Sequence, residues 1–168
     1  MLNKTHHIAI ICSDYRRSMD FYVEKLGFSV VREVWREERK DYLTMLQNGD
    51  VTLELFTKSN APARPTQPEA LGLRHLAFHV KDVEETAAWL NARGVETEPI
   101  RTDPVNGGRM TFFRDPDGLP LELHEQRGIY GNRKSQGRST LCVLRGKISR
   151  PAFRRSDRPA QRCPLGRD

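Results

Sequence analysis

Long apolar runs are missing from this sequence. No stretch of its 168 residues approaches the roughly 18–20 consecutive apolar residues that a transmembrane helix requires. Residues 1–7 also lack the apolar segment of a secretory signal. Cysteine is scarce, and the three cysteines are too scattered to suggest a disulfide framework: Cys12, Cys142 and Cys163. We therefore expect a cytoplasmic protein with no membrane segment.

Acidic residues are nearly absent from the end of the chain. Residues 127–168 hold 12 Lys/Arg but only Asp157 and Asp168, whereas residues 1–126 hold 16 Lys/Arg against 20 Asp/Glu. A segment with so little apolar surface and so much like charge cannot offset the entropy cost of ordering. We predict a basic, largely disordered tail over 127–168. It would bind nucleic acid only non-specifically, if at all.

The first 126 residues contain an internal repeat. His7-Ile8-Ala9 recurs as His75-Leu76-Ala77, and Leu53-Glu54-Leu55 recurs as Leu121-Glu122-Leu123, both 68 residues later. The separation between histidine and glutamate is therefore 47 residues in each half. Chance does not readily produce several landmarks in one register, so a duplication is the better interpretation.

Each half shows the same order of expected elements, βαβββ. A strand (5–12 and 73–80) precedes a helix that begins after Asp14 or Asp82 and ends at Gly27 or Gly94. Three strands follow in each half, near 28–36, 42–48 and 51–57, and then near 95–101, 109–114 and 119–125. The fold class is thus α+β. The predicted organisation is one domain over 1–126, made of module one (1–58), a proline-containing linker (59–72) and module two (73–126), followed by the tail.

Strand alternation places the four repeated polar residues on the faces turned away from the helices. Leu53 and Leu55 point to the core, so Glu54 points the other way, and Glu122 does the same between Leu121 and Leu123. The same alternation puts His7 and His75 on these faces. Two halves related by a pseudo-twofold axis would bring both histidines and both glutamates together.

The repeated set of two histidines and two half-buried carboxylates indicates a divalent cation, although any one of the four residues alone would be interpreted as structural. Unpaired carboxylates on an apolar face are costly and repel each other. Imidazole and carboxylate ligands suit zinc or nickel, with cobalt, manganese or iron as alternatives. The structural alternative is that Glu54 and Glu122 pair with Lys or Arg and that the histidines are core residues. The equal spacing in both halves favours the metal.

Four further residues are expected around the ligand. Parity places His79 and His124 on the same faces as the proposed metal ligands, where they would line the cavity. Arg109, beside the Gly107-Gly108 turn, could hold an anionic group of a substrate, and Phe113 could form part of an apolar wall. The alternatives are an ordinary surface position for the arginine and ordinary packing for the phenylalanine.

Several segments together resemble a known superfamily. They are His-His-Ile-Ala-Ile, Phe-Tyr-x-x-x-Leu-Gly-Phe, Glu-Leu-Phe, Gly-Leu-Arg-His-Leu-Ala-Phe and Asp-Pro-Asp-Gly-Leu-Pro-Leu-Glu-Leu. The pattern is similar to the vicinal oxygen chelate superfamily, and within it to glyoxalase I and lactoylglutathione-lyase-like proteins. By that resemblance His7, Glu54, His75 and Glu122 match the four metal-ligand positions, Glu122 is the catalytic base with Glu54 as its partner, and a homodimer is expected.

The resemblance implies a lyase or isomerase that acts on a hemithioacetal or related α-hydroxycarbonyl through an enediolate. The partner would be a small-molecule substrate such as a thiol adduct. A metal ion would chelate two neighbouring oxygens of that molecule while a carboxylate moves the proton. Two other functions stay open on the same fold. One is an epimerase or dioxygenase, and the other is a non-catalytic small-molecule-binding or resistance protein.

Overall fold

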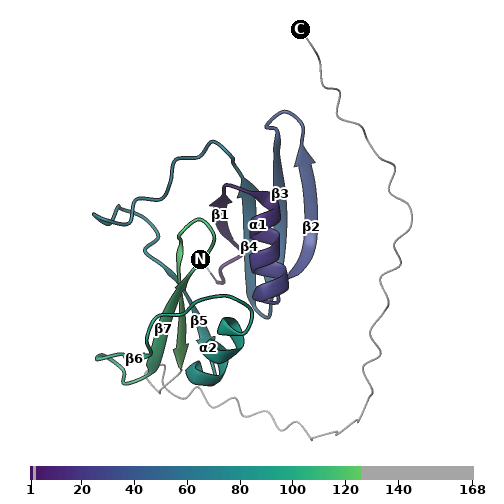
Figure 1. Cartoon of the computed structure of the whole chain (residues 1–168). Helices are drawn as coiled ribbons and strands as arrows, with labels where there is room; N and C mark the ends of the chain where they lie inside the picture. Colours follow the sequence, from purple (N-terminus) through teal and green to yellow (C-terminus); the bar gives the residue numbers. More distant parts are fainter. Residues whose placement is uncertain (2, 126–168) are drawn as a thin grey trace, which may run out of the picture. The chain divides into compact units, whose positions relative to one another are not determined.

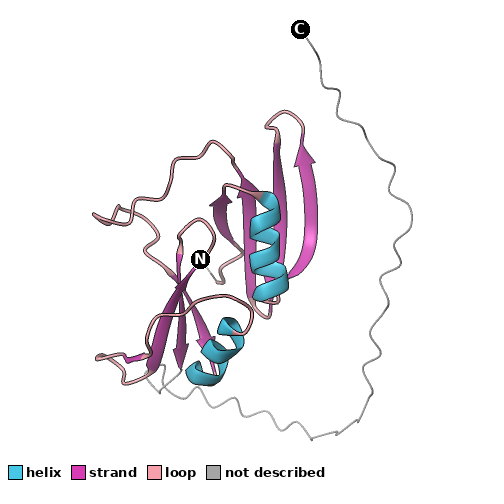
Figure 2. Cartoon of the chain, in the orientation of Figure 1, coloured by secondary structure: helices cyan, strands magenta, loops and turns pink. Residues whose placement is uncertain are grey.

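The structure, a computed structural model, describes residue 1 and residues 3–125. The predicted tail over 127–168 lies outside the described residues, as does Gln126, the last residue of the predicted domain. Within the described part, two mixed four-stranded sheets each carry their own helical segment on one face (Figures 1 and 2). This confirms the prediction of two tandem βαβββ modules.

Sheet one is built by module one in the order β1-β4-β3-β2. Its strands β1 and β4 are parallel, and the other neighbours are antiparallel. The strands are β1 (Ile8–Cys12), β2 (Ser29–Arg36), β3 (Asp41–Asn48) and β4 (Val51–Thr57). The helical segment comprises α1 (Tyr15–Met19) and the π-helical turn η1 (Asp20–Lys25).

Sheet two repeats that order in module two as β5-β8-β7-β6, again with the first two strands parallel. Its elements are β5 (Leu76–Val80), α2 (Val83–Asn91), β6 (Arg101–Thr102), β7 (Arg109–Arg114) and β8 (Pro120–Glu125). The shared topology is the structural form of the sequence repeat, because the same elements pair in the same order in both halves.

The helices begin where the sequence predicts, after Asp14 and Asp82, but the helical segments end at Lys25 and Asn91, before the predicted ends at Gly27 and Gly94. The carboxylate of Asp14 accepts a hydrogen bond from the backbone N–H of Arg17 at 2.8 Å, and Asp82 does the same for Glu85 at 2.9 Å. Such side chains satisfy amide groups that the first helical turn leaves without a partner. Gly94 follows α2 with a φ of 72°, which only glycine adopts without strain.

One expected strand is much shorter than predicted. The sequence suggests a strand near 95–101, but only Arg101 and Thr102 pair with β7. Pro99 has no amide hydrogen to donate, so it cannot contribute to a regular ladder. The preceding residues are attached to β7 by isolated bonds instead, such as the backbone N–H of Glu98 donating to the carbonyl of Phe112 at 2.7 Å.

The buried core lies between each sheet and its helical segment. Leu53 and Leu55 of β4 and Leu121 and Leu123 of β8 are all at most 4 % exposed, as the alternation predicts. Their burial turns the intervening residues to the opposite face of each sheet. We call this opposite face the ligand face of sheet one or sheet two. Among the described residues, no helix is both long and apolar enough to cross a membrane.

Candidate metal site

Each sheet brings one histidine and one glutamate into contact on its ligand face. His7 directly precedes β1, and Ala9 of β1 pairs with Glu54 of β4. The Nε2 atom of His7 consequently lies 3.3 Å from Oε2 of Glu54. Module two repeats this arrangement, because Ala77 pairs with Glu122 and His75 Nε2 lies 3.0 Å from Glu122 Oε2. The structure thus contains two equivalent His–Glu pairs.

In the described part of the chain, the carboxylates of these pairs form no salt bridge with lysine or arginine. Glu122 is only 5 % exposed, and the side chain of Glu54 is 17 % exposed. Within residues 1 and 3–125, the salt bridges of both glutamates are to histidine alone. A buried carboxylate needs a charged or hydrogen-bonding partner. The pairing with Lys or Arg that would make these residues purely structural is therefore not what the described part of the chain shows.

The two His–Glu pairs do not meet within one copy of the described chain. In that part of the protein no three His, Cys, Asp or Glu side chains come close enough together to hold a metal ion. The described part of one copy therefore holds the two His–Glu pairs separately.

The aromatic side chain beside the second pair is Phe112, not Phe113. Phe112 pairs with Glu122 across the β7–β8 ladder, and its ring lies edge-on to that of His75, with 5.4 Å between ring centroids. Phe113 points to the other face, is 3 % exposed and lies near Phe21. This corrects the choice of Phe113, because adjacent strand residues face opposite ways.

Arg109 also lies on the helix side of sheet two. Its guanidinium forms a salt bridge with Glu84 in the first turn of α2. Two residues separate Arg109 from Phe112, so the alternation of β7 turns Arg109 away from the ligand face. The expected role of Arg109 as a clamp for a substrate anion is therefore not supported by its position.

His79 and His124 are ladder partners on the ligand face of sheet two, as parity predicts. His79 is exposed, whereas His124 is engaged at both ring nitrogens. Its Nδ1 lies 2.8 Å from the carbonyl oxygen of Glu125, and its Nε2 lies 3.2 Å from a carboxylate oxygen of Asp103. His124 thus anchors the loop after β6. A Cβ on Gly108 would lie 2.8 Å from the His124 ring, so this position needs glycine.

His6 contacts the histidine of the first His–Glu pair, although it has no histidine counterpart in the second module. Its Nδ1 lies 2.7 Å from Nδ1 of His7, which leaves Nε2 of His7 turned toward Glu54. A hydrogen bond to one imidazole nitrogen fixes the tautomer and the orientation of a ligating histidine. The adjacent His-His pair is the signal in the sequence for this contact. The equivalent of His6 in the second half is Arg74, so a comparison of the two halves does not select His6.

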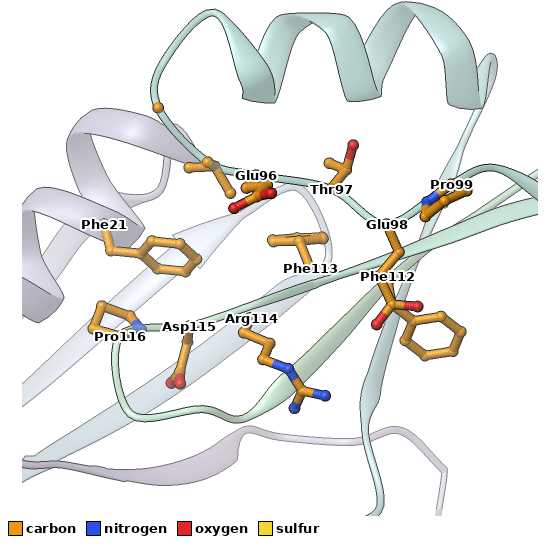
Figure 3. Close-up of a pocket in the computed structure, with 12 residues that line it drawn as sticks. Phe21, Glu96, Thr97, Glu98, Pro99, Phe112, Phe113, Arg114, Asp115 and Pro116 are labelled. Atoms are coloured by element: carbon orange, nitrogen blue, oxygen red, sulfur yellow. The ribbon is translucent and has the colours of Figure 1, made fainter.

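Two hollows are lined by other residues than the four of the His–Glu pairs. One, of about 530 Å³, is formed by the 94–99 connection, the end of β7 and Phe21 of η1; Figure 3 shows Phe21 beside Phe113, Asp115 and Pro116. The other, of about 660 Å³, lies between β1, the linker and the 115–119 turn. Neither hollow is lined by any residue of the two His–Glu pairs.

Comparison with known proteins identifies a family. Residues 4–123 match the family model described as the glyoxalase/bleomycin resistance protein/dioxygenase superfamily. The uncharacterized protein YwkD of Bacillus subtilis is 57 % identical over 127 residues, which cover 75 % of this chain and 99 % of YwkD. The crystal structure of a glyoxalase family protein from Enterococcus faecalis is 56 % identical with a TM-score of 0.71, and the match covers 73 % of this chain and 97 % of that one.

Two more distant relatives have names that state an activity. The "Probable lactoylglutathione lyase" of Vibrio cholerae is 32 % identical over 129 residues, covering 72 % of this chain and 89 % of its own. The 2-epi-5-epi-valiolone epimerase of an Actinomyces species is 31 % identical over 140 residues, covering 70 % and 76 %. Relatives of this chain therefore include proteins of both the lyase and the epimerase type.

Proposed function

Because this chain belongs to the glyoxalase/bleomycin resistance protein/dioxygenase superfamily, we propose that it is a metal-dependent, glyoxalase I-like lyase or isomerase. Its substrate would be a hemithioacetal or a related α-hydroxycarbonyl compound. The observation that carries this proposal is the pair of equivalent His–Glu contacts, one in each module, at 3.3 Å and 3.0 Å. The lactoylglutathione lyase-like relative supports the reaction type.

The donor set fits a divalent cation. His7, Glu54, His75 and Glu122 would hold it, since imidazole nitrogens and carboxylate oxygens are ligands of zinc and nickel, and also of cobalt, manganese and iron. Bound there, the cation would supply electrostatic stabilisation of the negative charge that develops on the substrate oxygens.

The cation site would be completed by a second copy of the chain. Each copy has two half-sites that do not meet among its described residues. If the ligand face of sheet one of one copy packs against that of sheet two of its partner, each dimer contains two complete sets of four ligands. A closed twofold arrangement of this kind is the commonest symmetry of soluble oligomers.

The proton-transfer step would fall to Glu122. Its carboxylate is the more buried of the two and faces away from the core of sheet two beside Phe112. In that position it can take the proton from the substrate carbon next to one oxygen and return it to the neighbouring carbon. Glu54, the equivalent residue of module one, would be its partner. Phe112 and Ala77 would exclude water from this end of the site.

An epimerase is the second candidate, because a relative with that name is 31 % identical. Both reactions begin with removal of a proton from a carbon, so proton exchange alone does not separate them. A lyase or isomerase of the glyoxalase type also forms a thioester, whereas an epimerase returns the proton to the same carbon.

Metal analysis and a turnover assay test the proposal together. We expect purified protein to hold about one divalent ion per chain, and the loaded enzyme to form thioester from methylglyoxal and a thiol. Deuterium incorporation at the substrate carbon, followed by NMR, detects abstraction without net product. Metal-depleted protein is the control. If loaded protein produces neither thioester nor exchange with any thiol, the catalytic assignment is wrong.

A further inference from the structure

Two basic side chains share one buried carboxylate near the end of sheet one. Asp41, at the start of β3, is 2 % exposed and accepts hydrogen bonds from Nε and Nη2 of Arg36, both at 2.6 Å. Lys58, directly after β4, forms a salt bridge with the same carboxylate. The hydrogen bonds from Arg36, and to a smaller extent the one from Lys58, lower the pKa of Asp41 to about 2. The carboxylate is therefore ionised near neutral pH.

This trio lies on the ligand face of sheet one, in line with Glu54. Met45 of β3 pairs with Glu54, and Asp41 is four residues before Met45, so both point the same way. Lys58 is likewise four residues after Glu54, and its backbone N–H continues the ladder by donating to the carbonyl of Cys12 at 2.7 Å. The guanidinium of Arg36 lies 4.8 Å from the ring centroid of Phe56, which stands between Lys58 and Glu54.

The charges of the trio do not cancel. One carboxylate faces two cations, which leaves a net positive charge, and Arg36 uses only one edge of its guanidinium on Asp41. The side chains of Arg36 and Lys58 are 21 % and 33 % exposed, so both remain accessible. The remaining N–H groups of a guanidinium and an ammonium are well suited to an oxyanion.

The fold itself does not require this trio. Phe112 pairs with Glu122 in module two as Met45 pairs with Glu54 in module one. Gly108, four residues before Phe112, is therefore the equivalent of Asp41. Gly108 has no side chain to hold two cations. A side-chain cluster needed only for sheet formation would be expected in both modules, whereas this trio has its carboxylate only in module one.

We propose that Arg36 and Lys58 form a subsite for an oxyanion at the far end of an elongated substrate. Asp41 is a positioning residue that holds the two cations on the ligand face. Lys58 is four residues of extended chain, about 13 Å, from Glu54, so an anionic group held at Lys58 would be several bonds away from the atoms that react near Glu54. Leu43 and Phe56, ladder partners between the two ends, would contact an apolar spacer. This inference rests on the proposed function.

A length series of thiols tests the subsite. Methylglyoxal is combined with ω-mercaptoalkanoic acids of two to ten methylene groups, and with ω-mercaptoalcohols of matching length. We expect kcat/KM to favour the acid over the alcohol by about tenfold or more, the usual worth of a charge-assisted hydrogen bond. The preference should peak at an intermediate length, because short chains cannot reach Lys58.

Lys58→Gln is the decisive variant, since it removes one cation and leaves the Arg36–Asp41 pair intact. It should abolish most of the preference for the acid and its dependence on length. The matched control is Arg39→Gln, which removes the same charge from an exposed position in the β2–β3 turn. It should keep both. An equal loss in the two variants would mean that only general electrostatic attraction is at work, and would overturn the subsite.

A binding measurement separates this inference from the proposed reaction. S-methylated forms of the same acids and alcohols cannot react, and their affinity for metal-loaded protein is measured by calorimetry. If they bind with the same length preference and need Lys58 while no thiol supports turnover, the subsite stands and the lyase assignment fails. If thioester forms and the acid has no advantage at any length, the reaction stands and the subsite fails.

Discussion

Among single residues, the two glutamates that we propose as metal ligands show how a strand can hold a buried carboxylate without losing its fold. Glu122 replaces an apolar residue between Leu121 and Leu123, yet the ladder supplies a histidine at 3.0 Å. The histidine gives this buried carboxylate one polar partner and so reduces the cost of its burial. A cation at the same place would reduce that cost further.

Glu122→Gln should separate metal binding from proton transfer. The amide oxygen can still coordinate, so we expect much of the metal to be retained. Turnover should fall by about 10²–10⁴, which is the usual contribution of a positioned general base. Metal content is measured by mass spectrometry and turnover by thioester absorbance. Glu54→Gln is the comparison, and an equal loss in both variants would show that either carboxylate takes the proton.

Asp41 should govern part of the acid sensitivity of the domain. Its pKa is lowered from 3.8 to about 2, so it stabilises the folded state above pH 3.8, and this stabilisation is lost as the pH falls toward 2. Asp41→Asn should flatten the dependence of the urea midpoint on pH in that window. Asp50→Asn, at an exposed turn position, is the control. An unchanged profile in Asp41→Asn would contradict the assignment.

Among the elements, the turn at 115–118 does more than connect β7 to β8. Tyr22 of η1 donates a hydrogen bond at 2.8 Å to Asp115, whose carboxylate also accepts from two backbone amides of its own turn. Asp117 accepts from the backbone N–H of Ser13 at 2.9 Å and forms a salt bridge with Arg17. Burial raises the pKa of Asp115. The turn thus joins module two to the helical segment of module one.

Tyr22→Phe should measure the strength of this junction. The change keeps the buried ring and removes one hydrogen bond to a buried carboxylate, so the free energy of unfolding should fall by about 1–2 kcal/mol. Chemical denaturation followed by circular dichroism gives the value. Tyr15→Phe removes a hydrogen bond to Glu33 at an exposed position and should change stability by less than about 0.5 kcal/mol. Equal effects would argue against a role for burial.

For the whole molecule, the separation of the two His–Glu pairs makes the proposed site depend on assembly. In the proposed dimer, each copy would supply donors to two sites, and each site would draw on two copies. Metal content, dimerisation and activity should therefore be lost together when the protein dissociates, because no single copy holds four ligands among its described residues.

A complementation experiment checks this shared site. One chain carries His7→Ala and Glu54→Ala, and the other carries His75→Ala and Glu122→Ala. Neither should bind metal tightly alone. Co-purified heterodimers should regain one intact site, formed by sheet one of the second chain and sheet two of the first, and hence about half the wild-type metal content. If each site formed within one copy, mixing would restore no metal.

Much of the fold follows from local patterns in the sequence. The Asp and Gly helix boundaries and the alternation of leucines with glutamates depend on neighbours along the chain. The repeat at 68 residues shows that the same pattern occurs twice, so together these features predict two βαβββ modules. β6 is shorter than the predicted strand, since Pro99 weakens a ladder without marking where pairing resumes. Phe112 rather than Phe113 faces the same way as Glu122, because adjacent strand residues point to opposite faces.

The sequence by itself determined which residues we propose as metal ligands, because strand parity and the equal His–Glu spacing can be read along the chain. Only the tertiary structure decided which of them meet. It joined each histidine to the glutamate of its own module, turned Arg109 toward Glu84, and gathered Arg36 and Lys58 around Asp41. Such contacts depend on the register between strands and on side-chain direction. Those are set by packing of distant segments and have no signature at any one position in the chain.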